Sequence, residues 1–291
     1  MNNDDFCLKI HRWAFSISGM KHFLVRLPFL VLVLPVCGFA ANAVVNLSHY
    51  DTMRPDFIGM KSEGIMAVIH EATYPSYERD AYYVTRQNAA TRAGLLWGAY
   101  HYANARDPVR QADHFLSAVL NAWQHAGPGA RPDGILLVLD FEKNGHYPGG
   151  TMRVDQAVTF VERIRERTGK YPGIYSGENH LRKVLTSSRI SASQKRALAN
   201  CWLWLANYGA EPRPTSPWNR WHLWQYCGDG KCRLPRSGYP KSVANIIRAE
   251  RNIFSGDRMA LETFWQEHAW QPGRDTLARK AEPARTLTAE R

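Results

Sequence analysis

The sequence predicts an α/β protein folded as an irregular (β/α) barrel, similar to a TIM barrel but with fewer helices than strands. Short, continuously apolar segments recur along the chain, as expected for strands of a parallel sheet covered on both faces. Segments with apolar residues at helical spacing separate the earlier strands. Eight strand candidates are enough to close a barrel, whereas the stretches between the last strands are too short for full helices.

Each predicted strand is a short run rich in aliphatic and aromatic residues. In chain order the strands are 43–48, 65–73, 95–103, 135–142, 172–177, 201–209, 221–228 and 243–254. Helices are predicted at 78–93, 107–125, 153–168 and 178–187. The third helix has the clearest pattern, because Val154, Val158, Val161 and Ile164 recur at helical spacing and Gly169 follows as a C-terminal cap.

Residues 1–43 are predicted to be a secretory signal peptide. Lys21 and Arg26 precede the apolar stretch 27–36, and small residues follow up to Ala43. Met20 is the natural start of such a leader. The apolar stretch is too short for a stable membrane span, so none is expected after cleavage.

The remaining chain is predicted to comprise a catalytic barrel at 44–271 and a flexible polar tail at 272–291, which contains few apolar residues. We expect a monomer that is exported to the periplasm or secreted.

The formal net charge of +11 indicates either an ordinary basic surface or attraction to an anionic polymer. No basic run is interleaved with aromatic residues, so nucleic acid is not an expected partner. No nucleotide-binding loop is recognisable, and no cofactor is expected.

Cys227 and Cys232 enclose the short polar loop "CGDGKC" and are candidates for a disulfide in an exported protein. A zinc site would need further ligands nearby, and none is evident. Cys201 is then a buried thiol or an alternative partner for one of the pair.

The stretch "GILLVLDFEKN" at 134–144 ends a buried run with Asp140 and Glu142. Alternate residues of a strand share a face, so these side chains are expected to point into the barrel mouth about 6.6 Å apart. Neighbouring carboxyl groups raise one another's pKa, and a protonated acid beside a carboxylate can cleave a glycosidic bond. The alternative is a capping or salt-bridging Asp140 with an exposed Glu142.

The order and spacing of several segments within 44–257 resemble glycoside hydrolase family 25, the lysozymes that cut the β-1,4 bond between N-acetylmuramic acid and N-acetylglucosamine in peptidoglycan. The segments are "VVNLSHYD", "AVIHEATYPSYERDAYYVTRQNAATRAGLLWGAYHY", "LVLDFEKN", "YPGIYSG", "WLWLANYG", "WHLWQY" and "RNIFSGD". The resemblance implies peptidoglycan glycan strands as the substrate. It also implies an irregular barrel fold.

The resemblance assigns Glu142 as the general acid and Asp140 as its partner carboxylate, which assists the substrate's acetamido group. It also implies substrate-binding positions at the ends of other strands: Tyr100, Tyr102, Tyr175, Trp224 and Gln225. For these side chains the alternative is packing within the barrel.

Three positions depart from the family pattern. Asn46 occupies the place of an aspartate at the end of the first strand, Glu250 replaces an aspartate on the last strand, and Glu71 replaces a lysine on the second. We include all three among the substrate-binding candidates. Glu71 could replace the carboxylate lost at Asn46, but a salt bridge is the favoured expectation for it.

These departures leave two other functions open: a non-catalytic peptidoglycan-binding protein, and a hydrolase of another N-acetylated glycan such as chitin. Histidines near strand ends invite a metal hypothesis, namely His49, His70, His101 and His146. They lack carboxylate or cysteine partners at ligand spacing, so no metal is expected.

Overall fold

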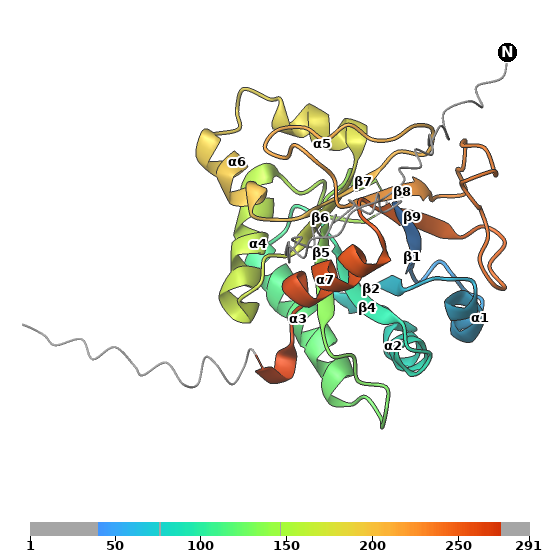
Figure 1. Cartoon of the computed structure of the whole chain (residues 1–291). Helices are drawn as coiled ribbons and strands as arrows, with labels where there is room; N and C mark the ends of the chain where they lie inside the picture. Colours follow the sequence, from blue (N-terminus) through green and yellow to red (C-terminus); the bar gives the residue numbers. More distant parts are fainter. Residues whose placement is uncertain (1–39, 76, 146, 275–291) are drawn as a thin grey trace, which may run out of the picture. The chain divides into compact units, whose positions relative to one another are not determined.

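The computed structural model describes residues 40–75, 77–145 and 147–274. Eight strands close into a barrel, and the pairing of β1 with β2 completes the circle (Figure 1). In barrel order the strands are β1 (Ala41–Leu47), β2 (Ala67–Tyr74), β4 (Leu96–Tyr102), β5 (Ile135–Asp140), β6 (Gly173–Gly177), β7 (Leu203–Ala206), β8 (Leu223–Cys227) and β9 (Glu250–Phe254). The predicted fold class is therefore confirmed.

The barrel is mixed and not wholly parallel, which corrects one expectation. Strand β9 runs antiparallel to both β8 and β1, while the other barrel pairs are parallel. A parallel return would need a crossover, usually a helix, between β8 and β9. Residues 228–249 form turns and short bridges instead, so β9 returns in the opposite direction.

Four of the helices correspond to the predicted ones: α2 (Tyr83–Arg92), α3 (Pro108–Gln124), α4 (Val154–Thr168) and α5 (Glu178–Leu185). Helix α2 begins later than predicted because the short strand β3 (Glu78–Arg79) pairs with β2. Sequence reasoning missed α1 (Phe57–Ser62), α6 (Ala192–Ala199) and α7 (Arg258–His268). Among the described residues, no helix has the length and apolar character needed to cross a membrane.

Alternation along the strands separates an inner from an outer hydrophobic layer. On β5, Leu136 and Val138 belong to the inner cluster, whereas Leu137 and Leu139 pack in the outer one with residues of the surrounding helices. Asp140 continues the inward series at the end of this strand. The alternation of inward and outward residues that builds the core thus also places polar side chains at the barrel mouth.

Strand β1 begins inside the segment assigned to the signal peptide. Ala41 and Ala43 are buried, and the Ala41 backbone N–H donates to Gly256 O at 2.8 Å. The expected domain boundary after Ala43 therefore falls within β1. The rest of the predicted leader (1–39) and most of the predicted tail (275–291) lie outside the described residues.

Two glycines of β6 provide a test of the packing. A Cβ on Gly173 would overlap the ring of Trp202, whereas a Cβ on Gly177 would meet no atom within 4 Å. We expect Gly173→Ala to lower the free energy of unfolding by about 1–3 kcal/mol through overpacking. Gly177→Ala, the matched control, should change it much less. Chemical denaturation followed by fluorescence measures both, and equal stabilities would contradict this packing.

Candidate active site

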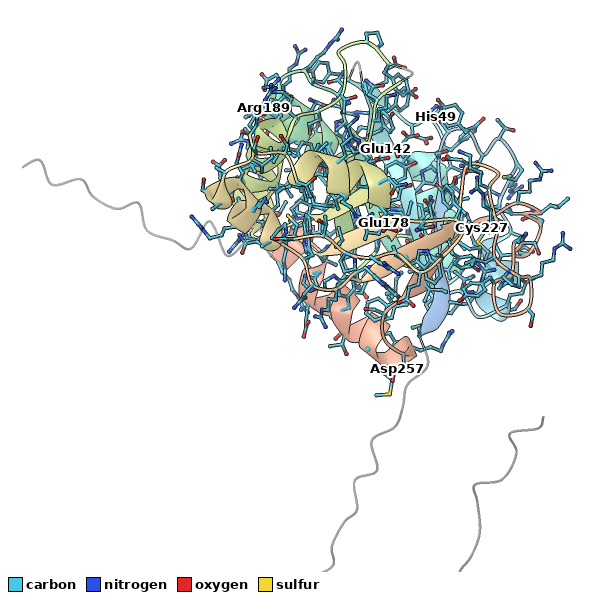
Figure 2. The ribbon with its side chains drawn as sticks, turned by 90° about the horizontal axis from the view of Figure 1, so that it is seen from above. His49, Glu142, Glu178, Arg189, Cys227 and Asp257 are labelled. Carbon is cyan, nitrogen blue, oxygen red and sulfur yellow. A yellow bond between two sulfur atoms is a disulfide. The ribbon has the colours of Figure 1, made fainter. Side chains whose placement is uncertain are left out.

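A cleft of about 1210 Å³ opens at the carboxyl ends of the parallel strands. Glu142 and His49 are seen at this end of the barrel in Figure 2. Nine of the predicted catalytic or binding residues line the cleft: Asn46, Glu71, Tyr100, Tyr102, Asp140, Glu142, Tyr175, Gln225 and Glu250. The barrel thus brings together side chains from seven strands or their ends.

Trp224 is the exception and requires a correction. Its indole packs behind the barrel wall with Tyr226 and Tyr239, and its Nε1–H donates to Asn207 O at 2.8 Å. Adjacent strand residues point to opposite faces, so Trp224 and Gln225 cannot both face the cleft. Gln225 takes the inward position.

Asp140 and Glu142 both line the cleft, with Phe141 buried between them in the outer hydrophobic cluster. Burial raises the pKa of Asp140 well above its ordinary range, and the charges of Glu142 and Glu71 add to the effect. Burial also raises the pKa of Glu142 to about 7. The pair therefore retains a proton near neutral pH, which is the state needed for acid catalysis.

A short loop supplies the charges that act on Glu142. Cys227 and Cys232 form a disulfide, and Gly228 and Lys231 exchange backbone hydrogen bonds across the turn between them. Asp229 on this turn raises the pKa of Glu142, while Lys231 lowers it. The closed loop thus holds two opposite charges at the edge of the cleft.

The floor of the cleft is a network around Glu250. This carboxyl accepts hydrogen bonds from the side-chain amides of Asn46 and Gln225 and from the Asp229 backbone N–H. Burial raises the pKa of Glu250 to about 8, although the hydrogen bonds from the Asp229 backbone and the Asn46 side chain oppose the shift. Tyr175 holds Gln225 from the other side by donating to its Oε1 at 2.7 Å.

Several lining residues escaped the sequence reasoning, among them Trp204, Tyr147 and Asp229. Trp204 faces inward from β7, and its Nε1–H donates to Asn252 Oδ1 at 2.8 Å. Alternation along β7 is the signal that could have revealed it. Tyr147 and Asp229 lie on loops, where no periodicity indicates which way a side chain points.

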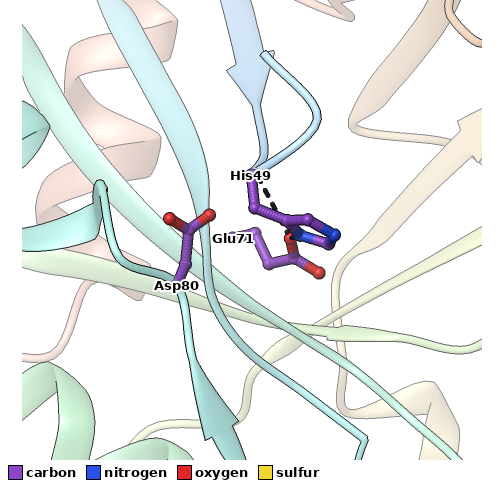
Figure 3. Close-up of side chains that lie close together, drawn as sticks. All are labelled: His49, Glu71 and Asp80. Carbon is purple, nitrogen blue, oxygen red and sulfur yellow. Dashed lines mark hydrogen bonds and ion pairs between the residues drawn. The ribbon is translucent and has the colours of Figure 1, made fainter. Parts of the chain in front are cut away.

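Glu71 lies against His49, whose Nδ1 contacts Glu71 Oε2. The hydrogen bond and charge of Glu71 raise the pKa of the His49 imidazole, although burial opposes the shift. Asp80 lies beside them, and within the described part of the chain these three residues are the group that could hold a metal ion (Figure 3).

The other histidines of the metal hypothesis do not join this group. His70 accepts a hydrogen bond from Arg86, and His101 bonds Thr73 and Gln111. His146 lies outside the described residues.

Comparisons with known proteins identify the family and the fold of the chain. The profile of glycosyl hydrolases family 25 matches residues 45–233. Lysozyme M1 of Streptomyces globisporus is 27% identical over 225 residues, which cover 72% of this chain and 71% of that protein. Two solved structures share the fold. A lysozyme from Streptomyces coelicolor has a TM-score of 0.59 and 23% sequence identity, and the match covers 78% of this chain and 98% of that one. A muramidase from Trichobolus zukalii has a TM-score of 0.58 and 21% identity, and the match covers 78% of this chain and 100% of that one.

The loop charges predict opposite changes in the titration of Glu142. Asp229→Asn removes a negative charge and should lower the pKa of Glu142 from about 7, whereas Lys231→Gln removes a positive charge and should raise it. NMR titration of the Glu142 carboxyl carbon in each variant gives the two shifts. Shifts of the same sign, or none in either variant, would refute this account of the cleft.

Proposed function

Because the chain belongs to glycosyl hydrolase family 25, we propose that it is a lysozyme that cuts the β-1,4 bond between N-acetylmuramic acid and N-acetylglucosamine in peptidoglycan. The family makes it a glycoside hydrolase. Relatives named lysozyme and muramidase support the polymer and the bond. The observation that carries the proposal is the buried pair Asp140 and Glu142 at the end of β5, lining a large cleft.

Glu142 acts as the general acid in this proposal and protonates the leaving glycosidic oxygen. Its pKa of about 7 keeps a large share of the group protonated at neutral pH. Asp140 acts as the partner carboxylate, which stabilises positive charge at the sugar and assists the acetamido group of the substrate. Because burial also raises the pKa of Asp140, the mechanism requires Asp140 to be ionised and the proton of the pair to be on Glu142 when the bond breaks.

The charges around the cleft favour peptidoglycan over a neutral glycan. Five cationic side chains line the cleft: Lys143, Lys231, Arg236, Lys241 and Arg248. Cations at the edge of a cleft attract an anionic polymer and raise its local concentration. Peptidoglycan carries carboxylates on its stem peptides, and on its lactyl groups where no peptide is attached, whereas chitin carries none.

The departures at Asn46 and Glu250 are compatible with activity. The longer side chain of Glu250 reaches Asn46, so a carboxyl group is still present beside the first strand. Asn252 Nδ2 and Gln225 Nε2 also donate to Asn46 Oδ1, at 2.9 and 3.2 Å. The amide at this position therefore bonds its neighbours through both its nitrogen and its oxygen, which fixes its orientation in the cleft.

Removal of the acid tests the mechanism. We expect Glu142→Gln to lower the rate of peptidoglycan cleavage by about 10²–10⁴-fold, the usual contribution of a general acid. Wild-type activity should fall as the pH rises above about 7, because deprotonated Glu142 cannot protonate the leaving group. Reducing-end release and mass spectrometry of the muropeptides measure the rate and the bond cut.

Glu262→Gln, on the exposed face of α7, is the matched control and should behave like the wild type. A Glu142→Gln variant that keeps more than a tenth of the wild-type rate would exclude Glu142 as the acid. A wild type that cleaves chitin oligomers but not peptidoglycan would overturn the proposed substrate.

We further propose that the protein is exported and that its leader is removed before β1. Asn42 would be lost by cleavage after Ala43, yet its side chain bonds Tyr226 and Arg251 at 2.9 and 3.0 Å. Gly38 and Ala40 are small residues that suit a cleavage site after Ala40, three residues earlier.

We therefore expect a mature N-terminus at Ala41 or before it. Intact-mass measurement and N-terminal sequencing of the exported protein locate the cut. A mature chain that starts at Val44 would show that the contacts of Asn42 are dispensable.

A further inference from the structure

Three potential metal ligands meet beside the cleft although they are far apart in the sequence. His49 follows β1, Glu71 lies on β2, and Asp80 follows β3. One ligand atom from each side chain lies within 4.8 Å of the others. Figure 3 shows the imidazole and the two carboxylates close together.

His49 is oriented by contacts on both of its ring nitrogens. Nδ1 lies against Glu71 Oε2, while Nε2 is 3.4 Å from the hydroxyl of Tyr147. The ring also stacks on Tyr74, with centroids 4.6 Å apart. A metal-binding histidine commonly donates its second N–H to a neighbouring oxygen, which fixes its tautomer and its orientation.

Asp80 has one oxygen in use and one without a hydrogen-bond partner. Oδ1 accepts from the Tyr82 backbone N–H at 2.7 Å. Oδ2 has no hydrogen-bond donor in the described part of the chain, and the side chain is fully buried, with 0% of it exposed. A buried carboxylate oxygen without a donor or a cation is costly, so it points to a missing ligand.

The neighbouring basic groups are committed elsewhere. Arg86 directs its N–H groups to the carbonyls of Ser48, Asp51 and Met53 and to His70 Nε2. His70 Nδ1 is 3.7 Å from Asp80 Oδ2, but it donates to the Glu71 carbonyl at 2.7 Å.

With Nε2 accepting from Arg86 and Nδ1 donating to a carbonyl, His70 is neutral. Neither of these groups therefore donates a hydrogen bond to the Glu71 carboxylate or to Asp80 Oδ2, although the charge of the Arg86 guanidinium acts on Asp80.

We propose that His49, Glu71 and Asp80 bind a divalent transition-metal ion, with Zn²⁺ as the best match. One imidazole nitrogen and two carboxylate oxygens suit Zn²⁺, whereas Mg²⁺ and Ca²⁺ prefer oxygen ligands alone. Three protein ligands leave a coordination position open, and Glu71 lines the cleft. If the cleft takes peptidoglycan as proposed above, an oxygen of the bound polymer can occupy that position. This polymer contact rests on the proposed function, but the ion binding does not.

Zn²⁺ binding to the whole, untagged protein tests the proposal without substrate. After removal of metals with a chelator, isothermal titration with ZnCl₂ and elemental analysis of dialysed protein should give one equivalent. We expect His49→Gln and Asp80→Asn to weaken binding at least tenfold. His125→Gln is the matched control, because His125 is exposed and its ring bonds Asn121 O of its own helix, and this variant should bind as the wild type does.

Asp80→Asn keeps the oxygen that accepts from Tyr82, and circular dichroism verifies folding. If either variant fails to fold, the Co²⁺-substituted wild type still decides: absorption bands of a four- or five-coordinate site with nitrogen and oxygen ligands support the proposal. An octahedral spectrum, no saturable binding, or equal affinity in His49→Gln and wild type would overturn it. Glu142→Gln should bind Zn²⁺ normally, so loss of lysozyme activity and loss of the metal site are distinguishable.

Discussion

Burial of carboxyl groups at the barrel mouth is the constraint on which the rest of the site depends. Glu71, Asp140, Glu142 and Glu250 share one cleft, and burial raises the pKa of each. Several buried negative charges side by side would destabilise the fold, so each acid is either protonated or given a partner. Glu250 has three donors and Glu71 has His49, whereas Asp140 Oδ1 has no hydrogen-bond partner among the described residues. Asp140, whose Oδ1 has no donor, is next to the proposed catalytic acid, and the proton of the pair offsets the cost of its burial.

The period-two alternation of the strands explains both how much of the site could be predicted and where prediction failed. Strand positions follow from local apolar runs, and most inward residues follow from strand parity. The prediction that Trp224 binds substrate is wrong, because adjacent strand residues face opposite sides and Gln225 already faces the cleft. The antiparallel β9 could not be predicted, because its direction depends on the loop 228–249 and not on the strand's own residues. For the same reason the grouping of His49 with Glu71 and Asp80 is invisible in the sequence: strand pairing brings the three segments together.

The departures from the family pattern are physically linked. An aspartate at position 46 would stand directly against the Glu250 carboxyl, and two buried anions there would repel one another. Asparagine instead donates to Glu250 and accepts from Asn252 and Gln225. Asn46 on the first strand, which lacks the charge of an aspartate, and Glu250 on the last strand, which is longer than an aspartate, thus compensate for one another. Glu71 belongs to a separate exchange, because it lies on β2, across β1 from Glu250, and its partner is His49.

The same burial resolves a conflict between catalysis and substrate binding. An anionic polymer would be repelled by a floor of ionised acids, yet the proposed chemistry needs acids on that floor. Because the pKa values of Glu142 and Glu250 are raised to about 7 and about 8, much of the floor's negative charge is absent near neutral pH. The cations of the cleft, among them Arg236 and Arg248, then attract the polymer against less opposing charge. Acidity of the floor and attraction of an anionic substrate are thus compatible only because the barrel mouth keeps its carboxyl groups away from water.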